Sequence, residues 1–106
     1  MVRRLKAWVH RSRQAALLGH AKLRPARDVL EAERDGLIVL LDLRREVYLG
    51  LDEVGTSIWR SLRGGARLAD IVARVADEYD APRDAIESDT TSFLNDLTTR
   101  RLVVYT

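Results

Sequence analysis

Residues 35–65 read DGLIVLLDLRREVYLGLDEVGTSIWRSLRGG and carry the clearest structural pattern of this chain. The Asp-Gly pair at 35–36 is a strong signal of a β-hairpin, because glycine tolerates the positive φ of a tight turn. Five consecutive apolar residues follow at 37–41, which indicates a strand covered on both faces. A polar turn at 42–45 then leads to another strand at 46–51. The stretch therefore predicts two successive antiparallel strands.

A third strand completes the predicted sheet. Residues 28–33 mix apolar and charged side chains, as is typical of a half-exposed strand, and they directly precede the hairpin. The strand at 46–51 then forms one edge of a three-stranded antiparallel meander. Its alternate residues face opposite sides of the sheet, with Val47, Leu49 and Leu51 on one side and Tyr48 and Gly50 on the other. A free edge of this kind invites pairing with another chain.

Three helices are expected after the sheet. Asp52 is well placed to cap the first helix, and the glycine pair at 64–65 ends it. The second helix has a complete apolar stripe over residues 68–79. Residues 102–105 close the chain as a short apolar strand or a packed tail.

The third helix, at 83–100, has a polar interruption in its apolar face. Asp89 and Thr90 lie between the apolar residues of that face, which are Ile86, Phe93, Leu94 and Leu97. Two readings stay open at this point. Either the polar pair makes a hydrogen bond at the edge of the core, or Thr90 and Phe93 line a shallow opening.

The composition is that of one small domain with a basic N-terminal arm. The chain has 106 residues, of which 46% are hydrophobic. Residues 1–27 carry eight Lys or Arg and no acidic residue, whereas residues 28–106 carry ten Arg and sixteen Asp or Glu. We therefore divide the chain into a basic amphipathic arm at 1–24 and a domain at 25–106. The arm is compatible with packing on its own domain or a neighbouring subunit, with an acidic partner protein, and with membrane or nucleic acid.

Residue types that carry catalysis or bind metals are scarce. The chain has no cysteine, so it has neither a thiolate metal site nor a thiol nucleophile. Its two histidines, His10 and His20, lie in the arm without nearby ligands, and the serines of the domain lack a histidine base. We expect no catalytic residues, no metal and no cofactor, and a function that resides in a binding surface. The absence of cysteine and of a membrane-length apolar run fits a soluble, cytoplasmic protein.

Several residues match one known family in order and spacing. In the sheet and first helix these are Leu41, Asp42, Tyr48, Leu51, Asp52, Ile58, Trp59, Leu62 and Gly65. Further along they are Asp70, Ile71, Tyr79, Asp89, Phe93, Leu94, Leu97, Leu102 and Val103. Residues 27–105 thus resemble the PqqD-like domain, also called the RiPP recognition element, of ribosomal natural-product biosynthesis.

The chain departs from the pattern of this family at two helix ends. Arg67 stands where Ser or Thr is common, so the second helix is expected to be less well capped. Arg101 stands where the family usually has glycine, so the third helix either enters a left-handed conformation there or ends differently.

The resemblance implies both a fold and a function. The fold is α+β and winged-helix-like, with a three-stranded antiparallel sheet followed by three helices and with the basic helical arm outside it. Domains of this family bind the leader of a precursor peptide as an extra strand, in the groove between the third strand and the third helix. By position, the backbone contacts fall to Val47, Tyr48, Leu49 and Gly50, and the side-chain pockets to Thr90, Phe93, Leu94 and Leu97.

The resemblance also implies partners besides the precursor leader peptide. These are a modifying enzyme or a leader peptidase, because a short stand-alone domain of this kind resembles the discrete partner of a leader peptidase in lasso-peptide pathways. The physical reading agrees with this function, since a free strand edge supplies main-chain donors and acceptors for strand addition.

Two other classes of function remain as alternatives, a DNA-binding protein and a structural subunit. A winged-helix DNA-binding protein brings basic side chains to the phosphates, but the third helix carries Asp84, Glu87, Asp89 and Asp96. Nucleic acid is therefore the disfavoured partner. A structural subunit that self-associates through its arm or free edge is the other alternative, and a homodimer through that edge is compatible with peptide binding.

Overall fold

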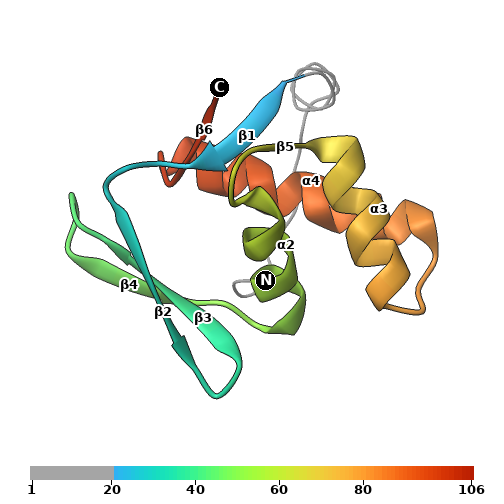
Figure 1. Ribbon diagram of the computed structural model, residues 1–106, viewed down its shortest axis with the longest axis horizontal. Coiled ribbons are helices and arrows are strands. Elements are labelled where there is room, and N and C mark those ends of the chain that lie inside the picture. Colours follow the sequence, from blue (N-terminus) through green and yellow to red (C-terminus); the bar gives the residue numbers. More distant parts are fainter. Residues whose placement is uncertain (1–20) are drawn as a thin grey trace.

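The computed structural model describes residues 21–106, which form two small antiparallel sheets and three helices (Figure 1). The arm predicted at 1–24 lies, as far as residue 20, outside the described residues. In chain order the elements are β1 (Lys22–Pro25), β2 (Val29–Arg34), β3 (Leu37–Asp42), β4 (Val47–Gly50), α2 (Glu53–Leu62), β5 (Ala66–Arg67), α3 (Leu68–Glu78), α4 (Arg83–Thr99) and β6 (Val103–Tyr105).

The predicted three-stranded meander is confirmed as the sheet β2-β3-β4, with both pairings antiparallel. Asp35 and Gly36 join β2 to β3 with φ angles of 55° and 82°, the two positive values that a type I′ turn requires. Cross-strand register pairs Leu41 of β3 with Leu30 of β2 and with Tyr48 of β4. The predicted hairpin turn at 35–36 is therefore confirmed, with Arg34 opposite Leu37 across it.

The prediction that the strand at 37–41 is covered on both faces is wrong. Along β3, buried and half-exposed residues alternate, with Ile38 and Leu40 in the core and Val39 and Leu41 half-exposed. Only the face that carries Ile38 and Leu40 packs into the hydrophobic core shared with the helices. An uninterrupted apolar run therefore marks a one-sided strand here, and the outer face of the sheet keeps a row of apolar side chains.

A second sheet, in the order β5-β1-β6, was not predicted. Leu23 of β1 is fully buried, and β1 pairs with β6 from the opposite end of the chain, with Pro25 opposite Val103. Among the described residues, Lys22 and Leu23 therefore belong to a sheet of the fold, although they lie inside the segment 1–24 that we assigned to the arm. Periodicity cannot detect this strand, because it is short and its partner lies far away in the sequence.

Hydrogen bonds cap the first helix and also tie it to the sheet. The Gly55 amide donates to the Asp52 carboxylate over 2.8 Å, which confirms the predicted cap of α2. Thr56, which is buried in the same turn, accepts a hydrogen bond of 3.0 Å from the Ile38 amide of β3. By contrast, Arg67 makes no side-chain cap at the start of α3, as expected from its residue type.

Trp59 anchors the same helix from its other end. Its indole Nε1 donates over 2.7 Å to the carboxylate of Glu31 on β2, and the guanidinium of Arg63 donates to the same carboxylate. Partial burial by itself raises the pKa of Glu31, but the hydrogen bonds from Arg63 and Trp59 outweigh it and lower the pKa below its ordinary value. Glu31 is therefore a carboxylate that supports the fold in its charged form.

The end of α4 shows which of the two expected outcomes holds at Arg101. This residue has a φ of 63°, in the left-handed region. The Leu102 amide donates to the Leu97 carbonyl over 2.9 Å and the Arg101 amide to the Thr98 carbonyl over 3.0 Å, which together form a Schellman motif. Glycine is the usual residue at this position, since the left-handed conformation costs other residues roughly 1–2 kcal/mol.

Candidate functional site

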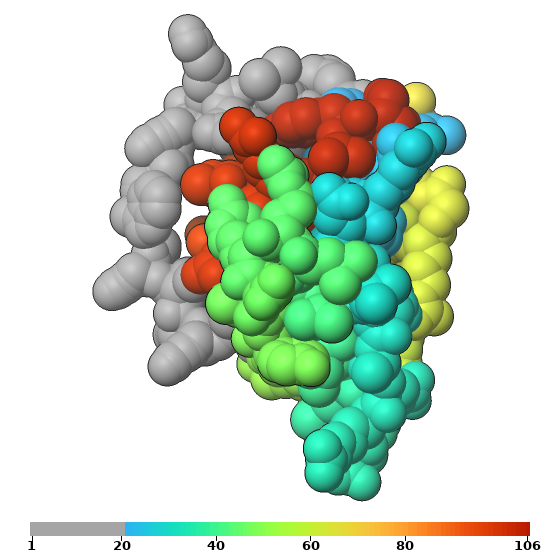
Figure 2. All heavy atoms as spheres, turned by 90° about the vertical axis from the view of Figure 1, so that its left-hand side faces the viewer, coloured from blue at the N-terminus to red at the C-terminus, as the bar shows by residue number. Residues whose placement is uncertain are grey.

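The outer edge of β4 is a free strand edge. Within the part of the chain that the structure describes, β4 pairs with β3 on one side and with no strand on the other. Tyr48 is 73% exposed and Val47 is 43% exposed, which makes them two of the large apolar side chains that the fold leaves uncovered. In Figure 2, β4 and the turn before it form a green surface that faces the viewer.

The register of the sheet shows which β4 residues offer their backbone groups at this edge. The Leu51 amide donates to the Ile38 carbonyl of β3. Since the direction of the main-chain groups alternates along an antiparallel strand, the N–H and C=O of Leu49 and Val47 also point toward β3. Those of Tyr48 and Gly50 point away from β3, so these two residues present the free donors and acceptors.

The four predicted residues of this strand therefore divide into two pairs. Tyr48 and Gly50 carry the outward backbone groups and lie on the outer face of the sheet. Val47 and Leu49 lie on the inner face, where Leu49 is 9% exposed but Val47 stays 43% exposed. The helices thus cover the inner face at Leu49 and leave it open at Val47, near the start of the strand.

The four α4 residues predicted for the side-chain pockets lie in the interior of the domain. Thr90, Phe93, Leu94 and Leu97 are all fully buried. The three apolar ones belong, together with Leu49, to the hydrophobic core that the helices and both sheets share. The Thr90 hydroxyl has no hydrogen-bond partner among the described residues. Half-exposed residues flank this stripe at Thr91, Ser92, Asn95, Asp96 and Thr98.

The turn before β4 is held against the end of α4 by a residue that sequence reasoning missed. Arg45 donates from Nη1 to the Asp42 carboxylate over 3.0 Å and to the Arg100 carbonyl over 2.9 Å. Burial raises the pKa of Asp42, but hydrogen bonds from the Arg45 side chain and from the amides of Arg45 and Arg44 outweigh it and lower the pKa. An Asp that ends a strand, with Arg three residues later, was the available signal.

This arrangement of sheet, free edge and third helix can be compared with known proteins. The family model described as Coenzyme PQQ synthesis protein D (PqqD) matches residues 38–103. The chain belongs to the PqqD family. A comparison with curated protein sequences gave no significant match.

Two solved structures are similar to this PqqD-family chain over most of its length. One is TbiB1 in complex with the TbiA(beta) leader peptide, with 36% sequence identity and a TM-score of 0.71 over 76% of this chain and 93% of that chain. The other is lasso peptide synthetase B1 complexed with the leader peptide, with 26% identity and a TM-score of 0.71 over 79% and 99% of the two chains.

A third similarity concerns the fold alone. It is to the tRNA-dependent lantibiotic dehydratase MibB from Microbispora sp. 107891, with 20% identity and a TM-score of 0.59. The match covers 86% of this PqqD-family chain and 9% of the dehydratase.

The described part of the chain offers neither a metal-binding cluster nor a membrane-spanning helix. Residues 21–106 contain no group of three or more His, Cys, Asp or Glu side chains that is placed to hold a metal ion. Among the same residues, no helix has the length and apolar character needed to cross a membrane. Both histidines lie outside the described residues.

Proposed function

We propose that this PqqD-family chain binds the leader of a ribosomally made precursor peptide, which adds as a strand to the free edge of β4. The chain is non-catalytic, in a winged-helix-like arrangement, and presents the leader to a modifying enzyme or a leader peptidase. The observation that carries the proposal is the edge itself, where Tyr48 and Gly50 direct backbone groups outward that no other described strand pairs, beside exposed side chains. The similarity to two proteins solved with leader peptides supports it.

The geometry of the edge gives each β4 residue a separate part in binding. The N–H and C=O of Tyr48 and Gly50 form the main-chain bonds with the leader. Alternate leader side chains then lie on opposite faces of the extended sheet. One set lies on the outer face beside Tyr48, and the other lies on the inner face, where Val47 is left open by the helices.

For α4 we propose an indirect part. Phe93, Leu94 and Leu97 have no exposed surface, and they pack in the core together with Leu49. Together with Thr90, they shape the floor beneath the peptide-binding groove and hold α4 at its distance from β4. The flanking half-exposed residues, such as Ser92 and Asn95, are the ones that α4 offers to a ligand.

The experiment is a titration followed by fluorescence anisotropy. The probe is the labelled leader of the precursor encoded beside the gene for this chain, and a scrambled leader is the control. We expect saturable binding at micromolar concentration or below for the leader alone. If neither this leader nor the product of any nearby small reading frame binds, the proposal is wrong.

The same edge is available to a second copy of the chain, so a homodimer and the leader compete for it. Light scattering of the chain alone and with saturating leader tests this point. A dimer that becomes a monomer on leader binding supports one shared edge, whereas a dimer that persists in the complex places the contact between copies elsewhere.

A further inference from the structure

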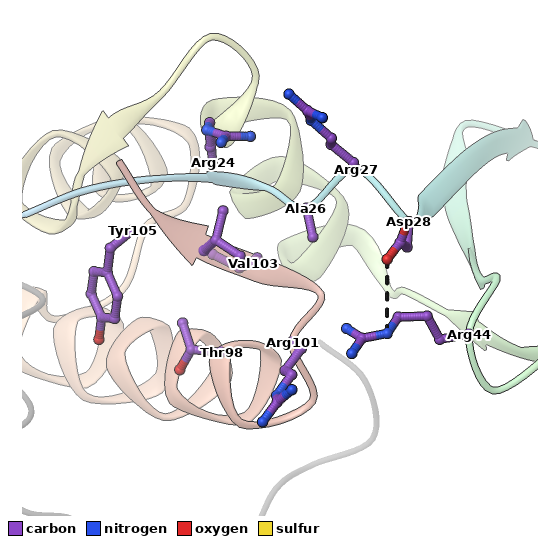
Figure 3. Close-up of a pocket in the computed structure, with 10 residues that line it drawn as sticks. Arg24, Ala26, Arg27, Asp28, Arg44, Thr98, Arg101, Val103 and Tyr105 are labelled. Carbon is purple, nitrogen blue, oxygen red and sulfur yellow. Dashed lines mark ion pairs between the residues drawn. The ribbon is translucent and has the colours of Figure 1, made fainter.

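An arginine-lined hollow lies beside the start of β4. It is an open depression of about 540 Å³ between β1, β6, the end of α4 and the turn before β4 (Figure 3). Its lining includes Arg24, Arg27, Arg44 and Arg101, with a single carboxylate at Asp28 and an apolar wall at Val103. Figure 3 shows the side chain of Arg44 extending toward Arg101.

The hollow has more positive charge than its own residues neutralise. Arg44 pairs with Asp28 over 3.8 Å, a long and solvent-exposed contact. Among the described residues, no acidic side chain forms an ion pair with Arg24, Arg27 or Arg101. Six acidic residues lie on α3 and in the first half of α4, at Asp70, Asp77, Glu78, Asp84, Glu87 and Asp89. Near the end of α4 the acidic residue is Asp96, whose carboxylate pairs with Arg100 over 2.9 Å, and Glu53 begins α2. An anionic ligand is therefore attracted to the hollow and repelled from the opposite end of α4.

Arg101, which lines the hollow, has a backbone conformation that is unfavourable for arginine. It holds the left-handed position of the Schellman motif, where glycine has no steric penalty. Strain of this kind at a residue that also lines a cavity points to a role for the side chain. Folding alone therefore does not explain why Arg101, and not glycine, stands at this position.

The hollow lies next to the turn that leads into β4, since Arg44 of that turn lines it. Arg44 precedes Val47 by three residues, and Arg45 fastens this turn to the carbonyl of Arg100, next to Arg101. A strand advances about 3.3 Å per residue, so a peptide that leaves β4 past Val47 reaches the arginines within a few residues.

We propose that the hollow binds acidic residues of the leader peptide, which lie just beyond the segment that pairs with β4. This inference rests on the proposed function and adds to it a charge requirement for the substrate. It also gives the leader a direction. The acidic end lies toward Arg44 and Arg101, and the other end runs toward the acidic start of α4.

The test is an anisotropy titration in which each of two protein variants, and the native chain, is titrated with each of two leaders. The variants are Arg101→Gly, which relieves the left-handed strain, and Arg27→Gln, whose side chain is exposed. The leaders are the native one and one in which Asp and Glu are replaced by Asn and Gln. We expect each variant to weaken binding of the native leader by about three- to tenfold, and to leave binding of the neutralised leader unchanged.

Thermal unfolding separates this effect from folding. Arg101→Gly is expected to raise Tm by roughly 2–6 °C, since glycine suits the left-handed position. Asp35→Gly is the matched control, because Asp35 is also left-handed but lies at the far tip of the β2–β3 hairpin. It is expected to raise stability without any change in leader binding.

Several results would overturn the proposal. If the native chain binds no leader at all, the proposed function falls and this inference with it. If the variants bind the native leader as the native chain does, or if the neutralised leader binds equally well, leader binding stands and the hollow has no part in it. An effect of the variants on binding of a partner enzyme alone assigns the hollow to that enzyme instead.

Discussion

The Arg45 guanidinium donates a hydrogen bond of 2.9 Å to the backbone carbonyl of Arg100, and so joins the turn before β4 to the end of α4. The same guanidinium nitrogen also donates to the buried carboxylate of Asp42. One exposed side chain therefore sets the spacing between the free strand edge and the third helix at the start of the proposed groove.

Replacing Arg45 by Ala is expected to weaken both stability and leader binding. The Arg100 carbonyl and the Asp42 carboxylate each lose a charged hydrogen-bond donor, and we expect Tm to fall by roughly 4–8 °C. Arg44→Ala is the control for stability, since its contact with Asp28 is 3.8 Å long and exposed. Calorimetry that finds equal shifts for the two variants would contradict a special part for Arg45.

The direction of the backbone groups along β4 can be tested with proline. Gly50→Pro removes an outward N–H and leaves the β3–β4 ladder in place, so leader binding is expected to weaken by about tenfold or more while the fold persists. Gly50→Ala is the matched control, because a Cβ at this position meets no atom within 4 Å. Leu49→Pro removes an N–H that faces β3, and is expected to unfold the strand. Circular dichroism must accompany each titration.

Two buried threonines are expected to respond to valine in opposite directions. The Thr90 hydroxyl finds no partner within residues 21–106, so Thr90→Val should raise the free energy of unfolding by about 1 kcal/mol. The Thr56 hydroxyl accepts from the Ile38 amide, so Thr56→Val should lower it by about 1–3 kcal/mol. Urea unfolding measures both. A Thr90→Val variant of native stability that loses leader affinity would instead place Thr90 in contact with the peptide.

The lowered pKa of Glu31 predicts a pH-dependent part of the stability. Because the folded-state pKa lies below the ordinary value of 4.5, this stability is fully present above that value and is lost as the pH falls through the folded-state pKa. We expect Glu31→Gln to be less stable than the native chain at pH 7, by about 0.5–1 kcal/mol after allowance for solvent screening. Unfolding curves from pH 7 to pH 3 should show this gap close; a constant gap would mean that packing, not charge, explains it.

Most of the fold was predictable because its signals are local. The Asp-Gly turn at 35–36, the Asp52 cap and the apolar stripe of α3 each depend on residues that are close together in the sequence. The second sheet was missed for the opposite reason. The pairing of Leu23 with Tyr105 joins the two ends of the domain, and neither short strand has a pattern of its own.

The sequence predicts which strand forms the candidate site, but not which of its residues and of the residues of α4 are exposed there. The sequence placed the free edge at 46–51 and named Tyr48 and Gly50 among its residues. It also assigned Phe93, Leu94 and Leu97 to pockets, although the structure buries them, because an apolar helical stripe looks the same whether it faces a core or a groove.

The order and type of the elements, the caps and the family pattern follow from residues close together in the chain, where short-range sterics and hydrogen bonding dominate. The folded arrangement alone assigns the outward backbone groups to Tyr48 and Gly50, places Arg45 against Arg100, and gathers four arginines from three separate segments around one hollow. These relationships depend on strand register and on packing between distant segments, for which a single sequence carries no periodic signal.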